Sequence, residues 1–180
     1  LNSGVHIDAV TADGKKVNWP NNPFAFTAQQ FRLPASLPPH GSVQLTFDWH
    51  YEISLESNRE GMIDSTTYFL AYFYPRVAVY DDYNGWDRMP FMDDHEFYSD
   101  FNDYDVTINV PKNYIVWGTG TLQNPGSLLQ PAILQRYNQS FTSDATIQIA
   151  TSDDVMNKRV TTQNAMNSWQ FKATDIPDMA

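Results

Sequence analysis

Apolar and polar side chains alternate along much of this chain. Between residues 42 and 53, the apolar positions Val43, Leu45, Phe47 and Trp49 lie two residues apart. This is the period of a β-strand that buries one face. The same period recurs in two other segments, which are 5–10 and 105–110.

The first alternating segment is followed by a turn signal. Val5, Ile7 and Ala9 share one face of the predicted strand, and Asp13-Gly14 comes soon after it. Asp-Gly is typical of a tight β-hairpin turn. Four further strands are predicted over 24–33, 114–121, 145–150 and 168–173.

The run 70–80 is almost wholly apolar and aromatic. A short continuous apolar run predicts a strand buried on both faces. Pro75 interrupts it and indicates a sheet edge, a bulge or a strand end. The following segment, 81–94, is polar and turn-like, and it carries Asn84-Gly85.

One short helix is expected after Asn124-Pro125. Apolar residues recur at roughly helical spacing from Leu128 to Tyr137, and Pro131 limits the length of this helix. With about eight to ten mostly antiparallel strands, the pattern predicts an all-β fold, a curved sheet or β-sandwich. The 180 residues suit a single β domain over 1–180.

Composition narrows the choice of partners. Hydrophobic residues make up 42% of the chain and charged residues only 18%, which is typical of a folded protein. The net charge of −10 argues against nucleic acid or an anionic membrane surface as partner. No apolar run approaches the ~20 residues of a membrane span, and there is no cysteine.

His95-Glu96 is the pair closest to a known catalytic motif. A zinc peptidase helix needs His-Glu-x-x-His, in which two imidazoles one turn apart bind the metal. Here Ser99 occupies the position of the second histidine. We therefore expect no zinc site, and no catalytic residue, in this chain.

Carboxylates are dense between residues 81 and 105. They are Asp81, Asp82, Asp93, Asp94, Glu96, Asp100, Asp103 and Asp105. Several converging oxygens could hold calcium, but Tyr104 and Asp105 break the EF-hand pattern. We expect solvated loop carboxylates, and a calcium site in these loops stays open.

The stretch 68–122 holds many aromatic and acidic residues, yet no complete catalytic or metal-binding set closes within it. This mismatch indicates that the chain is one part of a larger protein and not a self-contained enzyme. The five tryptophans could instead form a sugar-stacking platform, although aromatic residues of β domains more often pack in the core. They are Trp19, Trp49, Trp86, Trp117 and Trp169.

Five passages, in a fixed order, carry a resemblance to a known family. They are 33–47 with Leu-Pro-Pro-His-Gly-Ser, 73–86 with Tyr-Pro-Arg-Val-Ala-Val-Tyr-Asp-Asp, 96–111, 118–125 with Gly-Thr-Gly-Thr-Leu-Gln-Asn-Pro, and 169–180 with Trp-Gln-Phe-Lys-Ala-Thr-Asp-Ile-Pro-Asp-Met-Ala. The chain resembles the N-terminal domain of M1-family zinc aminopeptidases from about Val5 to Ala180. Met179 stands where the family has Phe, and Arg76 stands where Gln is expected.

The resemblance implies a β saddle that covers one side of an active-site cleft. The zinc and the His-Glu-x-x-His helix belong to a catalytic domain after residue 180, so this chain alone should be inactive and should hold no cofactor. Its partners would be that C-terminal catalytic domain of the same polypeptide and a peptide substrate. A periplasmic or extracellular setting is also implied.

In this family the N-terminal domain can hold the free amine of the substrate. The resemblance places the substrate-binding candidates at Tyr74, Arg76, Asp81 and Asp82. A carboxylate or amide there would suit an ammonium group through charge-assisted hydrogen bonds.

Two alternatives remain open. The first is a carbohydrate- or protein-binding β-sandwich module of a secreted or surface protein, which predicts an exposed strip of aromatic side chains. The second is a structural repeat domain of a cell-surface protein, which predicts similar β domains in the flanking sequence.

Overall fold

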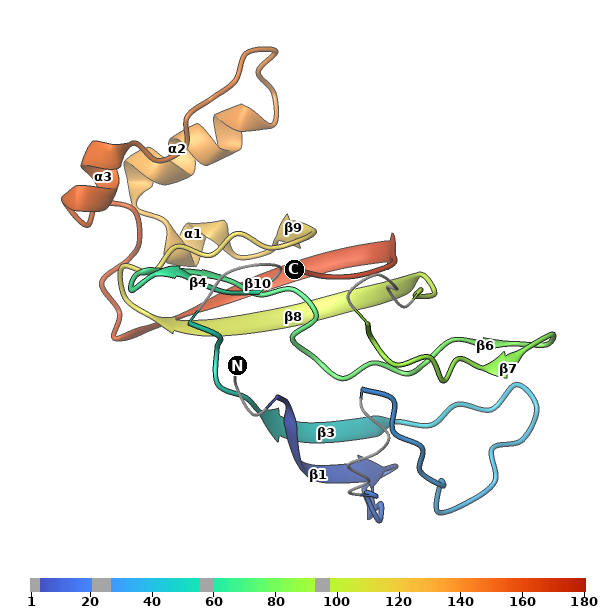
Figure 1. Cartoon of the computed structure of the whole chain (residues 1–180). Coiled ribbons are helices and arrows are strands. Elements are labelled where there is room, and N and C mark those ends of the chain that lie inside the picture. Colours follow the sequence, from blue (N-terminus) through green and yellow to red (C-terminus); the bar gives the residue numbers. More distant parts are fainter. Residues whose placement is uncertain (1–3, 21–26, 56–59, 93–97) are drawn as a thin grey trace. The chain divides into compact units, whose positions relative to one another are not determined.

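The computed structural model describes residues 4–20, 27–55, 60–92 and 98–180 (Figure 1). Over these residues it contains ten strands in antiparallel sheets and three short helices, which confirms the predicted all-β fold. The chain divides into two compact units, one of Leu1–Asp100 with Ala180 and one of Phe101–Met179. The single domain over 1–180 stays a prediction.

The N-terminal unit is built on a three-stranded sheet in which β1 lies between β2 and β3 (Figure 1). The bounds are His6–Ala12 for β1, Lys15–Lys16 for β2 and Leu45–His50 for β3. Asp13 and Gly14 both have positive φ, 48° and 73°, as the two central residues of a type I′ turn require. The predicted Asp-Gly hairpin is therefore confirmed.

A β-bulge in β1 changes which of its side chains are buried. The register against β3 shifts between Ile7 and Ala9, and an extra residue moves the following side chains to the other face. Ile7 therefore shares the core with Val10 and Ala12, and Ala9 is exposed. Of the predicted face of Val5, Ile7 and Ala9, only Ile7 packs on the core, and Val5 is exposed.

The core of this unit lies on one face of the sheet that contains β1 and β3. Leu45 and Phe47 pack on the buried side chains of Val10, Ala12 and Val17, which confirms the predicted buried face of the 42–53 segment. An aromatic cluster completes this core, with ring centroids 5.4–6.5 Å apart. Its members are Trp19, Phe31 and Phe47.

Two small hairpins complete the described part of this unit. Their strands are β4 at Gly61–Asp64 with β5 at Thr67–Phe69, and β6 at Tyr80–Asp81 with β7 at Gly85–Trp86. The second hairpin turns at Asn84-Gly85, as predicted, and Gly85 has φ 75°. The first hairpin was not expected, because its strands carry no clear alternation.

The strand predicted over 70–80 is wrong except at Tyr80. Tyr72 has φ 57°, and Pro75 lacks a backbone N–H to donate to a neighbouring strand. Both interrupt an extended ladder. Val79 is buried, but Val77 is 67% exposed, so the run is not buried on both faces.

Three other predicted strands also fail, wholly or in part. In 27–33 and in 145–150 the structure has no strand, and in 114–121 only Thr121 belongs to one. The rest of the first prediction, 24–26, lies outside the described residues. Several of these apolar side chains pack inside their unit without a strand partner, which sequence composition cannot distinguish from a strand.

The C-terminal unit is a second antiparallel sheet, with β10 between β8 and β9 (Figure 1). The bounds are Asn102–Pro111 for β8, Thr121–Leu122 for β9 and Met166–Ile176 for β10. The strands predicted over 105–110 and 168–173 are confirmed. Every second residue of β10 from Asn167 to Phe171 is buried, so one face of this strand forms the floor of the core.

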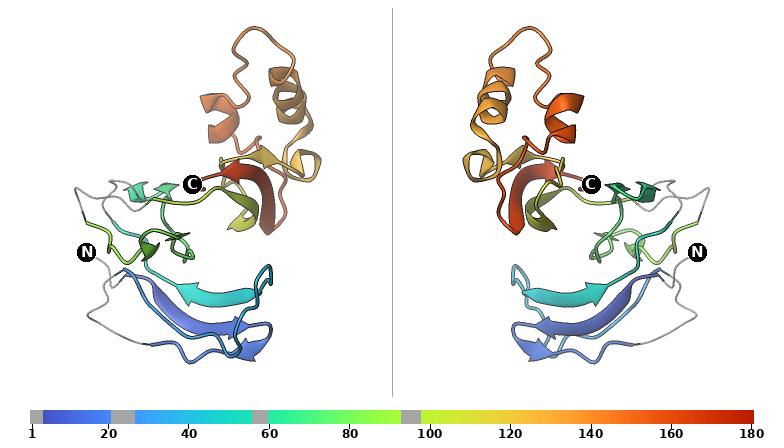
Figure 2. Two further views of the ribbon diagram at one scale, coloured as in Figure 1. Left: turned by 90° about the vertical axis from the view of Figure 1, so that its right-hand side faces the viewer. Right: turned by 90° about the vertical axis from the view of Figure 1, so that its left-hand side faces the viewer.

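Three short helices gather on one side of this sheet (Figure 2). They are α1 at Pro125–Leu128, α2 at Pro131–Ser140 and α3 at Ser152–Met156. Pro131 does not shorten a single helix; it starts a second one. Proline suits the first helical position and forces the preceding residue to be extended, as Gln130 is, with ψ 153°.

Candidate functional site

Asp81, one of the four predicted substrate-binding residues, closes the β6–β7 turn. Its carboxylate accepts the backbone N–H groups of Tyr83, at 2.9 Å, and of Asn84, and the hydroxyl of Tyr98, at 3.2 Å. These bonds, led by that of the Asn84 N–H, lower the pKa of Asp81 from its ordinary value. The oxygens of this carboxylate are thus largely occupied by hydrogen bonds to the turn and to Tyr98.

Arg76 and Tyr74 are half-buried in the same unit. The Nη1 of Arg76 donates to the Ser99 hydroxyl at 2.7 Å, and the ring of Tyr74 packs edge-on against Phe73 at 5.1 Å. Ser99 follows directly after Tyr98, which binds Asp81. Arg76 and Asp81 therefore bind two consecutive residues, Ser99 and Tyr98.

Asp82 differs from the other three predicted residues. Its side chain is exposed and makes no hydrogen bond to the described part of the chain. Of the two predicted carboxylates, Asp82 is therefore the one whose oxygens are available to an external cation.

The described residues contain no group of three or more His, Cys, Asp or Glu side chains that could hold a metal ion. The His95-Glu96 pair, which is closest to the zinc peptidase motif, lies outside these residues, as do Asp93 and Asp94. The acidic segment near 103–105 belongs to β8, where Asp103 accepts the backbone N–H of Asp175 and Asp105 pairs with Lys172 at 2.9 Å.

The tryptophans have different environments. Trp19 and Trp49 pack against other aromatic rings of the N-terminal unit, and Trp169 is only 2% exposed in the C-terminal unit. Trp86 and Trp117 are exposed, one in each unit. Core packing therefore accounts for three of the five positions.

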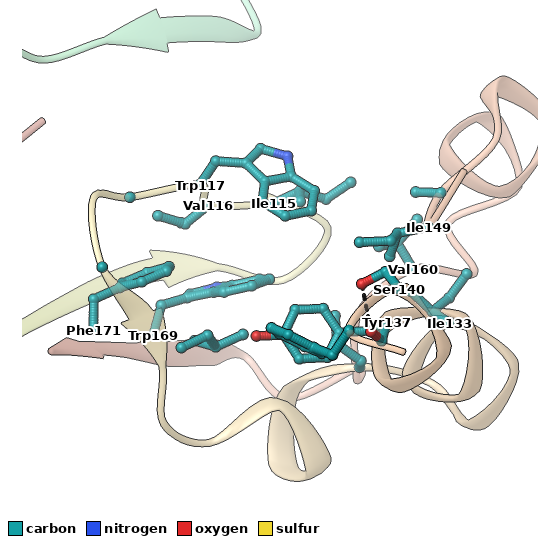
Figure 3. A pocket seen from close by; sticks show the side chains of 16 residues that line it. Ile115, Val116, Trp117, Ile133, Tyr137, Ser140, Ile149, Val160, Trp169 and Phe171 are labelled. Carbon is teal, nitrogen blue, oxygen red and sulfur yellow. Dashed lines mark hydrogen bonds between the residues drawn. The ribbon is translucent and has the colours of Figure 1, made fainter. Parts of the chain in front are cut away.

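The C-terminal unit contains a cavity of about 260 Å³ that the sequence did not indicate. Ile115 and Trp117 lie on one side of it, Trp169 on the opposite side, and α2 contributes Ile133 and Tyr137 (Figure 3). Because these side chains are apolar or aromatic, they look like ordinary core residues in the sequence. Only the fold shows that they leave a space.

Few polar groups border the cavity, and none of its side chains is charged. The Nε1–H of Trp169 is buried and has no hydrogen-bond acceptor among the described residues. Burial raises the pKa of the Tyr137 hydroxyl. The hydroxyl of Ser140 donates to the Tyr137 carbonyl at 2.7 Å.

Two of the sequence motifs, 118–125 and 169–180, meet beside this cavity. The backbone N–H of Gln123 donates to the Gln170 carbonyl at 2.8 Å. The side chain of Asn124 donates to the Ser168 carbonyl at 2.8 Å and accepts the N–H of Gln170 at 3.1 Å. The first motif is thereby fixed to the backbone of β10.

The glycines of the first motif allow this close approach. Gly120 has φ +97°, and a Cβ there would lie 2.4 Å from the Lys172 carbonyl oxygen. A Cβ on Gly118 would lie 3.3 Å from the ring of Phe171 and 3.5 Å from the methyl group of Met179. The side chain of Met179 is only 2% exposed.

Comparisons with protein-family models, with curated proteins and with solved structures found no match to this chain. Among the residues that the structure describes, no helix is long and apolar enough to cross a membrane.

Proposed function

We propose that this chain is the non-catalytic N-terminal domain of an M1-type zinc aminopeptidase. In this role it covers one side of the active-site cleft and helps to position the N-terminus of a peptide. The observation that carries the proposal is the contact between motifs 118–125 and 169–180, which lie far apart in sequence yet form one packed arrangement.

This contact supports the resemblance, because two passages that matched the family only by chance would not be expected to contact each other. Asn124 bonds the backbone on both sides of Trp169, and Gly120 is required by the close approach of Lys172. The residues that define the two motifs are thus the ones that this fold needs at those places. This is the pattern expected of a shared structural element.

The passage 73–86 supports the proposal in the same way. Tyr80 and Trp86, which are paired across the hairpin, have ring centroids 5.0 Å apart. Asp81 holds the turn, and Gly85 supplies its positive φ. The Tyr-Asp and Gly-Trp pairs of this passage therefore specify a hairpin.

In the intact enzyme the chemistry would belong to the catalytic domain, whose zinc polarises the scissile carbonyl and activates water. This domain would contribute orientation of the substrate. Asp82 is the best candidate to hold the substrate ammonium group, because its carboxylate is exposed and unbonded among the described residues. Arg76 is engaged with Ser99, and its positive charge opposes an ammonium group.

The direct test is the coding sequence that follows Ala180. The proposal expects His-Glu-x-x-His, with a further Glu downstream, within the next few hundred codons. A following sequence without this motif would overturn the proposal.

A second candidate function is a carbohydrate- or protein-binding module. The exposed aromatic residues of the β6–β7 hairpin favour it, since Tyr80 is 59%, Tyr83 is 92% and Trp86 is 49% exposed. This function predicts saturable glycan or protein binding that is lost in a Tyr83→Ala, Trp86→Ala variant. The aminopeptidase proposal predicts no glycan binding by either protein.

A further inference from the structure

The face of the N-terminal sheet opposite its core carries two histidines from distant parts of the sequence. His6 on β1 is the register partner of His50 on β3, and the centroids of their imidazole rings lie 5.2 Å apart, with the ring planes inclined by 19°. Both residues are exposed, since the core is formed by neighbours of opposite orientation such as Ile7 and Phe47. Strand pairing therefore brings the two imidazoles together, and no sequence spacing indicates it.

Asp8 determines which nitrogen of His50 can bind a ligand. Asp8 lies in the β-bulge between Ile7 and Ala9, and its Oδ2 accepts a hydrogen bond from the Nδ1 of His50 at 2.8 Å. An ionised carboxylate can only accept, so the neutral imidazole carries its hydrogen on Nδ1 and keeps a lone pair on Nε2. A metal-binding histidine usually donates its other ring N–H to such a carboxylate. Asp8 and His50 thus have the arrangement of a metal ligand with its supporting group.

The spacing of the two rings suits one shared ion. Imidazole nitrogens bind transition-metal ions at about 2.0–2.1 Å, which puts each ring centroid roughly 3.2 Å from the ion. Two imidazoles at a right or tetrahedral angle then have centroids about 4.5–5.2 Å apart, and the observed 5.2 Å lies at the end of this range. His6 is exposed, so its ring can turn to aim a nitrogen at the ion. Water would fill the other positions, because the described residues supply no group of three ligands.

Ligand type and charge select the ion. Imidazole suits copper, nickel and zinc, whereas calcium and magnesium prefer oxygen ligands. Asp48, two residues before His50, is exposed on the same face as Asp8, and these two carboxylates favour a cation there. Affinity for nitrogen ligands is highest at Cu²⁺ and lower at Zn²⁺. Zn²⁺ should therefore bind this pair more weakly than Cu²⁺ and be lost on desalting.

We propose that His6 and His50 form a binding site for one Cu²⁺ ion, with Asp8 as the positioning residue. The Nε2 of His50 and one ring nitrogen of His6 bind the ion, and water completes its coordination. This site goes beyond the proposed function, because it requires neither a peptide nor a second domain.

The test uses the full 180-residue chain after removal of metal ions. Calorimetric titration with Cu²⁺ should show one saturable site per chain, and the electron paramagnetic resonance spectrum of the complex should show two imidazole nitrogens. In ¹H–¹⁵N spectra, less than one equivalent of Cu²⁺ should first broaden the backbone signals beside His6 and His50. Broadening that starts elsewhere, or the lack of a saturable site, would overturn the proposal.

Histidine variants localise the site. His6→Gln and His50→Gln each remove one ligand at an exposed position and should abolish saturable binding. His40→Asn is the matched control, because His40 is an exposed histidine outside the sheet and asparagine tolerates its φ of 58°. It should bind Cu²⁺ like the parent protein. Copper held by His6 and the chain terminus alone would survive His50→Gln, and that result would overturn the proposal. If either Gln variant fails to fold, the signal broadening in the parent protein decides.

Asp8→Asn tests the positioning role of the carboxylate. It should lower the affinity for Cu²⁺ about tenfold, while the resonance spectrum still shows two imidazole nitrogens because Asp8 is not itself a ligand. Asp144→Asn removes the same charge from an exposed position outside the sheet and should leave the affinity unchanged. Equal affinities of the two variants would contradict the role of Asp8.

Discussion

At the scale of single residues, Gly120 is the glycine at which a side chain would be hardest to accommodate. It combines φ +97° with a Cβ position only 2.4 Å from the Lys172 carbonyl oxygen. We expect Gly120→Ala to destabilise the chain by at least about 2 kcal/mol, because it adds backbone strain to a backbone clash. Urea unfolding followed by circular dichroism measures this change.

Gly126 supplies the matched control for that substitution. It lies in α1, has no positive φ, and a Cβ there would meet nothing within 4 Å. Gly126→Ala should remain within about 0.5 kcal/mol of the parent protein. Equal effects of the two substitutions would contradict the close approach of motif 118–125 to β10.

Asp82 tests the proposed contact with substrate. In the longer polypeptide that the proposed function requires, Asp82→Asn should lower kcat/KM for a peptide with a free N-terminus by about tenfold. The expected cause is the loss of a charge-assisted hydrogen bond to the ammonium group. Steady-state kinetics of the purified enzyme measure the change.

The control for this variant is Asp144→Asn. Asp144 is also exposed, so the substitution changes the net charge equally without touching the hairpin. We expect parent kinetics from it. If both variants behave like the parent enzyme, Asp82 does not hold the amine.

At the scale of elements, the start of α3 depends on ionised Asp154. The Thr151 backbone N–H and hydroxyl donate to the Asp154 carboxylate, while the Asp154 N–H donates to the Thr151 hydroxyl. Arg136 on α2 reaches the same carboxylate at 2.6 Å. These bonds, first those from Thr151, hold the pKa of Asp154 well below its ordinary value.

This lowered pKa predicts a pH-dependent stability. The unfolded chain binds the proton more tightly, so the contribution of Asp154 is complete above the unfolded pKa of about 3.9 and is lost as the pH falls below it. Asp154→Asn should therefore be less stable than the parent at pH 7, and the difference should shrink below about pH 4. Urea midpoints from pH 7 to pH 3 measure it, and a constant difference would contradict the ionic role.

The elements also show which part of the fold the sequence could predict. Alternation identified 42–53 and 105–110 correctly, because each of these strands has one buried face and a long partner. Apart from Tyr80, the apolar runs 70–80 and 145–150 share strand composition but have no ladder. Burial alone produces both patterns, and hydrogen-bond partners cannot be inferred from apolar composition.

At the scale of the whole molecule, the absence of a catalytic set in the sequence leads to a prediction about activity. We expect the 180-residue chain to hydrolyse no aminoacyl p-nitroanilide and to bind no stoichiometric zinc. Under the proposed function, a longer polypeptide should do both, because its catalytic domain would carry the metal ligands. Parallel assays with zinc analysis by atomic absorption measure the difference, and zinc-dependent hydrolysis by the short chain would falsify the proposed function.

The candidate site was only partly accessible from the sequence. The resemblance placed Tyr74, Arg76, Asp81 and Asp82 together, but it could not show that Asp81 is used by its own turn while Asp82 is left unbonded. That distinction depends on the side chain of Tyr98 and on the direction of two backbone N–H groups. Neither follows from sequence spacing.

The sequence by itself determined the all-β class, the positions of the alternating strands and the Asp-Gly and Asn-Gly turns. These depend on local rules, the two-residue period of a strand and the positive φ of turn residues. Only the tertiary structure decided the division into two units, the contact between the two motifs and the cavity above Trp169. These features depend on which distant segments pack together and on how completely they fill the space between them.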